Sequence, residues 1–538
     1  MSRLTRLWHG AVELAGTRRG ACLLVAAALV VHAIQSLGWP VAPGRDLGAY
    51  LVYYAEMWQW DAVFPWAMLS RTPGGPLVLG GVLDVGSGLV LEVVAALLFA
   101  GSILAWALTA RTFGRAPALV VGVALVLYPG YGVIFHEWTV DLPTAALFAG
   151  WSLLLVRTLL RPTWWRLALV GAGIAALVLT RPANQALLVA ALAPLVVAAP
   201  WRARLARSAV VGVVAIALLA GWAALNGARY DDVTIARGGG AVMPLFRAFV
   251  TDRIVSPDNG PASRKLAAAV ERELLGLEPY RSYGIDLEEF FSSGSARMQE
   301  DLVSLSDRVW GWDSDYAVLR DVGREAVLAH PGAFVRGVAR SYWELLSQPL
   351  FAGRDQTTPA GSAGGTAAPI PLPSSSPEGE PLPTPSEGEP IPSENQSSSL
   401  STPDGSLREV WTSATDHHLE LANPSDQARI DAVNRKIDEL LATFPHHWSS
   451  DWLGLQLDRS SKLFPPLWLL VLVGAVAVAW RRPARWPLLV LPAALALVVL
   501  LVTVLAVYGI PYYSVPFAPA FVLLAAGGLL GDRRARSA

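Results

Sequence analysis

The chain has 538 residues, of which 53% are hydrophobic and only 16% charged, against about 25% charged in an average soluble protein. This balance excludes an ordinary soluble protein and indicates an integral membrane protein. The formal net charge of −1, without a basic tract, argues against nucleic acid as a partner. Cys22 is the only cysteine, so neither a disulfide nor a thiolate metal site can form within one chain.

Apolar runs long enough to cross a bilayer, roughly 17–25 residues, recur at both ends of the chain. The sequence therefore predicts an all-α polytopic membrane protein. The first run follows a basic N-terminus without a convincing cleavage site, so we expect it to be retained as a span. Ten spans are expected at 22–39, 89–110, 117–134, 140–156, 167–180, 183–199, 209–225, 463–480, 487–507 and 515–530.

The arginines orient these spans, because cytoplasmic loops carry an excess of Lys and Arg. Arg3, Arg6, Arg18 and Arg19 predict a cytoplasmic N-terminus. Every loop that ten alternating spans then place inside is basic, namely 111–115, 157–166, 201–207, 481–486 and the C-terminal tail. We therefore expect a multi-pass protein of the cell membrane, with both termini cytoplasmic and one large extracytoplasmic loop.

Five segments follow from this layout. They are an N-terminal transmembrane module of seven spans (1–225), an extracytoplasmic helical loop (226–353), a linker (354–407), a second extracytoplasmic helical segment (408–462) and a C-terminal module of three spans (463–538). The linker is rich in Pro, Ser, Gly and Glu and has few bulky apolar residues. It cannot bury enough surface to offset its ordering entropy, so it is predicted to be disordered.

One helix of the second extracytoplasmic segment is predicted from its periodicity. Its apolar residues share one helical face, and they are Ile430, Val433, Ile437, Leu440 and Leu441. Ser425, just before this pattern, is the expected N-cap.

The stretch GRDLGAYLVYYAEMW, residues 44–58, follows the first span. Its larger side chains recur at the spacing of one helical face, and they are Tyr50, Tyr53, Tyr54, Met57 and Trp58. Such an aromatic stripe is typical of a helix that lies along the membrane interface. Asp46 falls at the start of this helix, where it either caps the helix or serves as a general base for a hydroxyl acceptor.

Four segments resemble, in order, the landmarks of the GT-C membrane glycosyltransferases: RDLGAYLVYYAEM, SRTPGGPLVLGGVLD, TVDLPTAALFAGWSLLL and GAGIAALVLTRPANQALLV. The resemblance is to the branch that includes lipid A aminoarabinose transferases and protein O-mannosyltransferases. Asp46, Tyr50, Glu56 and Met57 match the spacing of that branch. The resemblance covers the N-terminal module, whereas the large loop and the last three spans agree in layout. It implies a GT-C-like bundle of about ten transmembrane helices with juxtamembrane helices on the outer face.

The resemblance also implies a reaction. An inverting enzyme of this kind moves a hexosyl or pentosyl group from a polyprenyl-phosphate carrier to a lipid, polysaccharide or protein acceptor of the cell envelope. Asp46 would be the general base or orient the acceptor hydroxyl, and Asp141 would be a second acid of the same site. Arg71 would face the donor phosphate, which needs a fixed cation as it leaves. Glu137 and the tyrosines Tyr50, Tyr53 and Tyr54 would line the sugar or acceptor.

Other polar residues near the expected outer face leave two interpretations open. His136 and Glu137 either bind a divalent cation, the one cofactor that the sequence suggests, or make surface hydrogen bonds. Arg181 is either a phosphate contact or the ion-pair partner of an acid such as Glu92 or Asp141, because an unpaired charge at that depth is costly.

Arg336 and Arg340 stand at i and i+4 on an amphipathic segment, so they either grip a lipid phosphate or snorkel to the interface. Two other classes of protein also stay open. A transporter or flippase of a lipid-linked intermediate would carry ionisable residues at span midpoints or broken helices in repeated halves, and the sequence shows neither. A catalytically inactive GT-C relative is the third possibility, because Leu47 stands where many relatives have a second acid.

Overall fold

The computed structural model describes residues 3–347, 407–413, 416–445, 448–507, 509 and 511–532. The linker predicted to be disordered, 354–407, lies outside the described residues except for Leu407. The described chain is almost entirely helical, as predicted, with two small two-stranded sheets.

Apolar helices occupy all ten positions predicted for spans. In the part of the chain that the structure describes, six are long and apolar enough to cross a membrane: α2 (Arg18–Ser36), α6 (Gly88–Arg111), α9 (Asp141–Leu160), α11 (Trp201–Tyr230), α22 (Trp486–Ala506) and the run Tyr512–Leu530 that ends in α23 (Ala518–Leu530). The third predicted span is broken, because α7 (Arg115–Val126) is bent by 72° from the run Pro129–Phe135, which comprises α8 (Pro129–Gly132) and the 3-10 helix η1 (Val133–Phe135). Three shorter helices fill the remaining positions: α10 (Trp164–Thr180), the 3-10 helix η2 (Pro182–Val196) and α21 (Leu467–Arg481).

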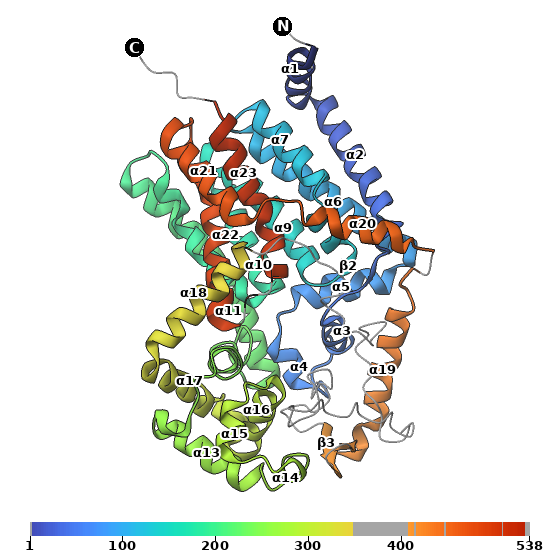
Figure 1. Ribbon diagram of the computed structural model, residues 1–538, viewed down its shortest axis with the longest axis vertical. Coiled ribbons are helices and arrows are strands. Elements are labelled where there is room, and N and C mark those ends of the chain that lie inside the picture. The colour runs from blue at the N-terminus through green and yellow to red at the C-terminus, as the bar shows by residue number, and fades with distance from the viewer. Residues whose placement is uncertain are drawn as a thin grey trace.

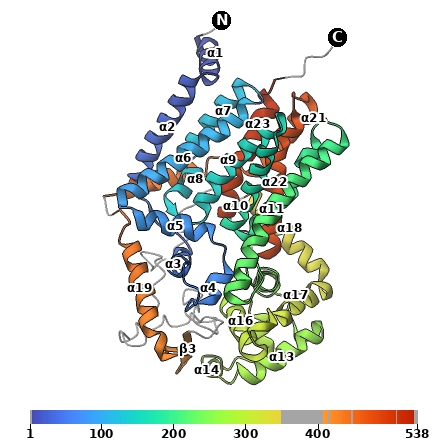
Figure 2. The same cartoon turned by 180° about the vertical axis from the view of Figure 1, so that it is seen from behind.

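The apolar helices gather at one end of the molecule, and most helices of the large loop lie at the other (Figures 1 and 2). Helix α1 (Arg3–Ala15) and the end of α23 lie at the same end, the one farther from the large loop (Figure 1). Chain ends on one side of a bundle agree with the even number of spans expected from the sequence.

The first part of the large loop has a hydrophobic core of its own. It consists of α12 (Val242–Phe246), the π-helical turn η3 (Arg247–Thr251), η4 (Pro257–Asn259), α13 (Pro261–Glu273), α14 (Tyr280–Tyr283), α15 (Leu287–Ser292), α16 (Ala296–Trp310), η5 (Trp312–Ser314) and α17 (Ala317–Ala329). Phe249, Phe290 and Tyr316 are fully buried at its centre. Helix α18 (Pro331–Ser347) leaves this core and packs against α21 and α22. Helix α12 also packs against α22, and Arg247 donates to the Val507 carbonyl at 3.0 Å, so the loop contacts the bundle through its first and last helices.

The second part of the loop begins with a hairpin that the sequence pattern did not predict. Strands β3 (Leu407–Trp411) and β4 (His417–Leu421) pair antiparallel, with Leu407 opposite Leu421. Helix α19 (Gln427–Leu441) follows and buries Ile430, Val433, Ile437 and Leu440, as its periodicity predicts. Helix α20 (Asp451–Ser461) then leads to the last spans.

The predicted Ser425 cap of α19 is wrong. Ser425 lies inside a short 3-10 helix, η8 (Pro424–Asp426), and Asp426 takes the N-cap position of α19 without a side-chain capping bond. The backbone N–H of Ser425 donates instead to Oδ1 of Asn423, at 3.2 Å. The Asn423 side chain therefore caps η8, the 3-10 helix before α19, rather than α19 itself.

Three short helices follow the first span and lie between the bundle and the large loop (Figure 2): α3 (Leu47–Glu56), α4 (Pro65–Ser70) and α5 (Gly74–Val85). The predicted aromatic stripe is cut short, because α3 ends at Glu56 and leaves the exposed Trp58 beyond it. Helix α19 packs against both α3 and α5, and Lys436 Nζ contacts Asp84 of α5.

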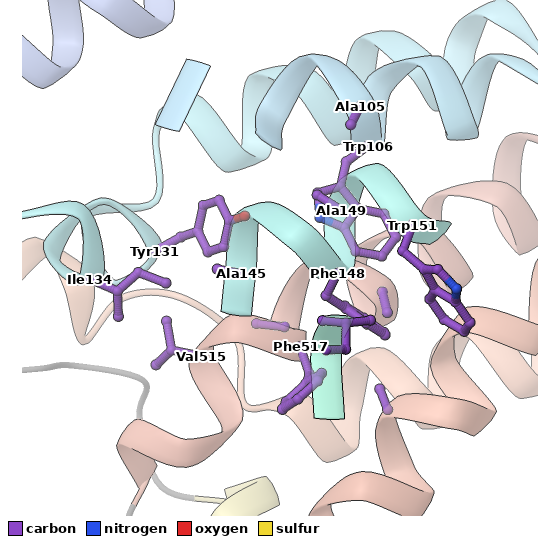
Figure 3. Close-up of a cluster of buried hydrophobic side chains, with 14 of the residues drawn as sticks. Ala105, Trp106, Tyr131, Ile134, Ala145, Phe148, Ala149, Trp151, Val515 and Phe517 are labelled. Atoms are coloured by element: carbon purple, nitrogen blue, oxygen red, sulfur yellow. The ribbon is translucent and has the colours of Figure 1, made fainter. Parts of the chain in front are cut away.

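An aromatic cluster underlies the junction of the N-terminal and C-terminal modules (Figure 3). Ring centroids of Trp106 and Phe148 are 5.8 Å apart, and those of Phe148 and Phe517 are 5.0 Å apart. These rings join α6, α9 and the 3-10 helix η9 (Pro511–Phe517). The cluster therefore fixes α9 relative to η9, and both elements carry residues of the site described next.

Candidate active site

A short parallel strand pair brings two distant parts of the sequence together. Strand β1 (Ala42–Pro43) pairs with β2 (Glu137–Trp138), with Ala42 opposite Glu137 and Pro43 opposite Trp138. Gly44, next along the chain, permits this approach, because a Cβ atom there would lie 2.0 Å from Thr139 Cγ2. The residues after β1 and the residues after β2 are thereby placed side by side.

Asp46 occupies the N-cap position of α3 but does not cap it. Its backbone is left-handed, with φ of 62°, a conformation that Asp adopts more readily than most residues. An N-cap residue normally has extended backbone so that its side chain reaches the first N–H groups. The Asp46 carboxylate makes no such bond, so the capping hypothesis is wrong. Its side chain is 58% exposed, and Oδ2 lies 3.7 Å from Arg45 Nε.

Asp141, the first residue of α9, is held in a buried ion pair. Its Oδ1 accepts a 2.6 Å hydrogen bond from Nη1 of Arg181, at the end of α10, and the two side chains are 4% and 14% exposed. The backbone N–H of Asp141 donates to Thr139 Oγ1 at 3.2 Å. Of the two interpretations of Arg181, the structure thus shows the ion pair, and its partner is Asp141 rather than Glu92.

Two tyrosines of η9 lie against the arginines. The Arg45 guanidinium is 5.6 Å from the ring centroid of Tyr512 and 5.1 Å from that of Tyr513, and Arg181 is 4.6 Å from Tyr513. Burial lowers the pKa of Arg45, but Tyr513, Asp46 and Asp141 together outweigh it and raise the pKa. Arg45 is therefore a fixed cation at this site.

Tyr50 and Arg71 complete the cluster. The Arg71 guanidinium, at the end of α4, is 5.3 Å from the Tyr50 ring centroid. Burial raises the pKa of Tyr50, partly opposed by Arg71 and Arg181, so the phenol stays protonated and can donate a hydrogen bond. Asp46 and Asp141 also act on this pKa, which indicates that all five groups share one electrostatic environment.

Two of the other predicted lining residues, Tyr53 and Tyr54, lie elsewhere. Tyr53 is buried, and the charged groups that act on its hydroxyl are Arg229 and Tyr230, not those of the cluster. Tyr54 donates from its hydroxyl to Asp84 Oδ2 at 2.8 Å. The structure thus brings Tyr50 to the cluster but not Tyr53 or Tyr54.

His136 and Glu137 are buried, at 0% and 5% exposure, so the expectation of surface hydrogen bonds is wrong. Glu137 Oε2 accepts a 2.7 Å hydrogen bond from the Tyr512 hydroxyl, and the His136 ring stacks on His32 with centroids 4.1 Å apart. Within the described ranges no three His, Cys, Asp or Glu residues gather as metal ligands would.

Arg336 and Arg340 are both exposed on α18. Arg340 Nε pairs with Glu344 at 3.1 Å, with the arginine side chain 83% exposed. The structure therefore places these two arginines on the exposed face of α18 and not in the cluster.

Sequence reasoning missed four residues that build or support the site: Arg45, Glu56 as a buried acceptor, Tyr512 and Tyr513. Glu56 is 2% exposed and accepts hydrogen bonds from the backbone N–H groups of Val63 and Phe64, at 2.6 and 3.0 Å. These bonds fix the turn between α3 and α4, and hence where Arg71 lies. The position of Arg45 beside Asp46 was the one signal in the sequence.

The fold and the cluster define a polytopic helical membrane protein in which three arginines and two carboxylates meet at the end of the bundle that faces the large loop. A scan of protein-family models found no match, and a search of curated proteins found none either. Two solved structures of ArnT from Cupriavidus metallidurans are similar to this chain. The one bound to undecaprenyl phosphate has 16% identity and a TM-score of 0.32, over 96% of this chain and 78% of that one. The apo structure has 15% identity and a TM-score of 0.31, over 94% and 77%. The function proposed below rests on the side chains of the site rather than on these two matches.

Proposed function

We propose that the protein is an inverting membrane glycosyltransferase, which moves a sugar from a polyprenyl-phosphate carrier to an acceptor on the extracytoplasmic face. One observation carries the proposal, the convergence of Arg45, Arg71 and Arg181 with Asp46 and Asp141. The location supports it as well, because the cluster lies where juxtamembrane helices meet the ends of spans. A donor held in the bilayer by its lipid reaches such a site.

The arginines fit the leaving phosphate. As the bond between the anomeric carbon and the phosphate oxygen breaks, negative charge builds on the phosphate, and fixed cations stabilise it. Arg45 and Arg181 each pair with a carboxylate of the cluster. Arg71 has no ion-pair partner among the described residues, and it lies over the Tyr50 ring. Arg71 is therefore the cation best able to bind the donor phosphate.

The two acids fit different roles. Asp141 is buried in a 2.6 Å ion pair, so it holds Arg181 in place rather than accepting a proton. Asp46 is 58% exposed and its partner is 3.7 Å away, so its carboxylate is accessible to a substrate hydroxyl. In the proposed displacement, the acceptor oxygen bonds to the anomeric carbon, its proton passes to Asp46, and the lipid phosphate leaves from the opposite face.

The experiment uses purified full-length protein in lipid, with radiolabelled polyprenyl-phosphate sugars and a cell-envelope extract as the source of acceptor. Asp46→Asn is expected to lower transfer by roughly 10²–10⁴-fold, the range for loss of a general base. Asp61→Asn is the matched control, because Asp61 is an acid of the same loop that is 83% exposed and lies outside the cluster. Unchanged transfer with Asp46→Asn would sink the general-base role, and no turnover by the wild type with any donor would favour a transporter or an inactive relative.

The broken third span is the feature that bears on the transporter alternative. Its break lies at Tyr128, which is buried and stacks on Phe464 with centroids 3.7 Å apart. A transport site would place charged groups or exposed backbone at such a break. The aromatic packing favours a structural bend instead, and the enzyme remains the better supported function.

A further inference from the structure

A second polar site lies between α9 and α10, at the end of these helices opposite the candidate active site. It is a pocket of about 280 Å³, lined by Gly150, Leu153, Leu154, Arg157, Thr158 and Arg166. Arg157 follows Asp141 along α9 by about 24 Å, at 1.5 Å per residue. This approaches the roughly 30 Å thickness of the hydrocarbon core, so the pocket opens near the other face of the membrane.

The walls of the pocket form an apolar slot. Trp151 Nε1 donates to the Val170 carbonyl at 3.0 Å and so fixes the spacing of α9 and α10. Gly150, beside it, is exposed, and a Cβ atom there would meet nothing within 4 Å. The slot is therefore open at Gly150 and bounded by Leu153 and Leu154, which suits a hydrocarbon chain.

One end of the slot is cationic. Arg157 is exposed and Arg166 is half-buried, and neither has an acidic partner in the described ranges. Arg166 stacks on Trp165, 5.0 Å from the ring centroid. Arg166 Nη1 also donates to the Arg161 carbonyl, at 3.4 Å. Two cations without an acidic partner in the described ranges, beside an apolar slot, are complementary to an anionic headgroup that carries an acyl chain.

We propose that this pocket binds an anionic phospholipid, with its phosphate on Arg157 and Arg166 and one acyl chain along the slot. The arginine-rich loop 157–166 is expected on the cytoplasmic side, where anionic lipids attract basic residues and basic pockets between spans bind their headgroups. The exposed Trp164 and Trp165 fit the headgroup level. This site is separate from the glycosyltransferase proposal and stands without it.

The test measures lipid binding to the purified full-length protein by native mass spectrometry, with phosphatidylglycerol, phosphatidylcholine or inorganic phosphate added. We expect phosphatidylglycerol to bind preferentially. The double variant Arg157→Gln/Arg166→Gln should weaken it about 30-fold, from roughly 1 kcal/mol for each arginine. The matched control is Arg202→Gln/Arg207→Gln, which removes two arginines from the start of α11, expected on the same side of the membrane, and should leave binding unchanged.

A second variant tests the slot without changing charge. Gly150→Leu fills the open side, so it should weaken binding of phosphatidylglycerol while leaving that of inorganic phosphate unaffected. Equal losses in the two arginine double variants would show a general electrostatic attraction and overturn the site. Binding of inorganic phosphate as strong as that of the lipid would overturn the choice of a phospholipid. Retained binding in Gly150→Leu would overturn the placement of the chain.

Discussion

The buried ion pair between Asp141 and Arg181 allows the two acids of the site to be separated by experiment. Removing one partner of a buried pair leaves the other charge uncompensated and costs about 3–5 kcal/mol. The Arg181 side chain is 14% exposed and its guanidinium lies 4.6 Å from the Tyr513 ring centroid. Both features partly compensate the arginine charge when the Asp141 charge is removed. We therefore expect Asp141→Asn to lower the free energy of unfolding by about 3 kcal/mol, at the lower end of that range.

Asp46→Asn is the control, because it removes the same charge from the neighbouring acid. Its carboxylate is 58% exposed and 3.7 Å from Arg45, and an exposed ion pair contributes at most about 1 kcal/mol. Unfolding is followed by near-ultraviolet circular dichroism as a denaturing detergent is titrated into the purified protein. Asp46→Asn should shift the free energy of unfolding by roughly 0.5 kcal/mol or less, while lowering transfer by roughly 10²–10⁴-fold.

A double-mutant cycle supplies the decisive result. Asp141→Asn/Arg181→Gln should be less destabilised than the sum of the single variants, with a coupling energy of about 2 kcal/mol, since the pair is removed only once. Additive effects, or an Asp141→Asn variant as stable as Asp46→Asn, would contradict the assignment of Asp141 to a positioning role.

Three further variants test how the site is built. Gly44→Ala should destabilise the protein by about 2 kcal/mol, because the new Cβ overlaps Thr139 Cγ2. Adding Thr139→Ser deletes that methyl group and should restore much of the lost stability, as measured by thermal unfolding. Glu56→Gln should lower the stability by about 2 kcal/mol in the same assay, because two buried N–H groups lose a charged acceptor. The control Asp61→Asn should change the stability very little, and equal losses in the two variants would contradict the role of Glu56. Arg71→Gln should weaken the binding of a polyprenyl phosphate by about 10–100-fold, the effect of losing a charge-assisted hydrogen bond. Fluorescence titration measures this affinity, and an unchanged value would exclude Arg71 as the phosphate contact.

The bundle could be predicted from sequence because a span depends on local hydropathy and length. The break in the third span was not predicted, although the sequence contains its cause. Pro129 cannot continue the hydrogen bonding of α7, and Gly130 follows it. The start of α19 was not predicted, because whether Ser425 or Asn423 caps depends on whether a separate 3-10 helix, here η8, precedes α19. Hydrophobic periodicity locates a helix but does not select among adjacent polar residues at its end.

Part of the cluster was predicted. The resemblance identified Asp46, Tyr50, Arg71 and Asp141, and the cost of an unpaired charge led to Glu92 or Asp141 as alternative partners of Arg181, beside a phosphate contact. Tyr512 and Tyr513 were not predicted as site residues, because nothing local in the sequence places η9 against residues more than three hundred positions earlier. That contact is set by tertiary packing of η9 on α9.

The pairing of β1 with β2 explains why such a site is built on so little regular structure. Two residue pairs are enough, because β1 lies a short connection after α2 and β2 a short connection before α9, and the bundle already fixes the positions of both helices. Asp46 then needs only a left-handed turn to direct its carboxylate away from α3 and keep it exposed, whereas Asp141, as the first residue of α9, is buried beside Arg181. The difference in environment between two neighbouring acids follows from backbone geometry, and it separates a carboxylate that can meet a substrate from one that holds a cation in place.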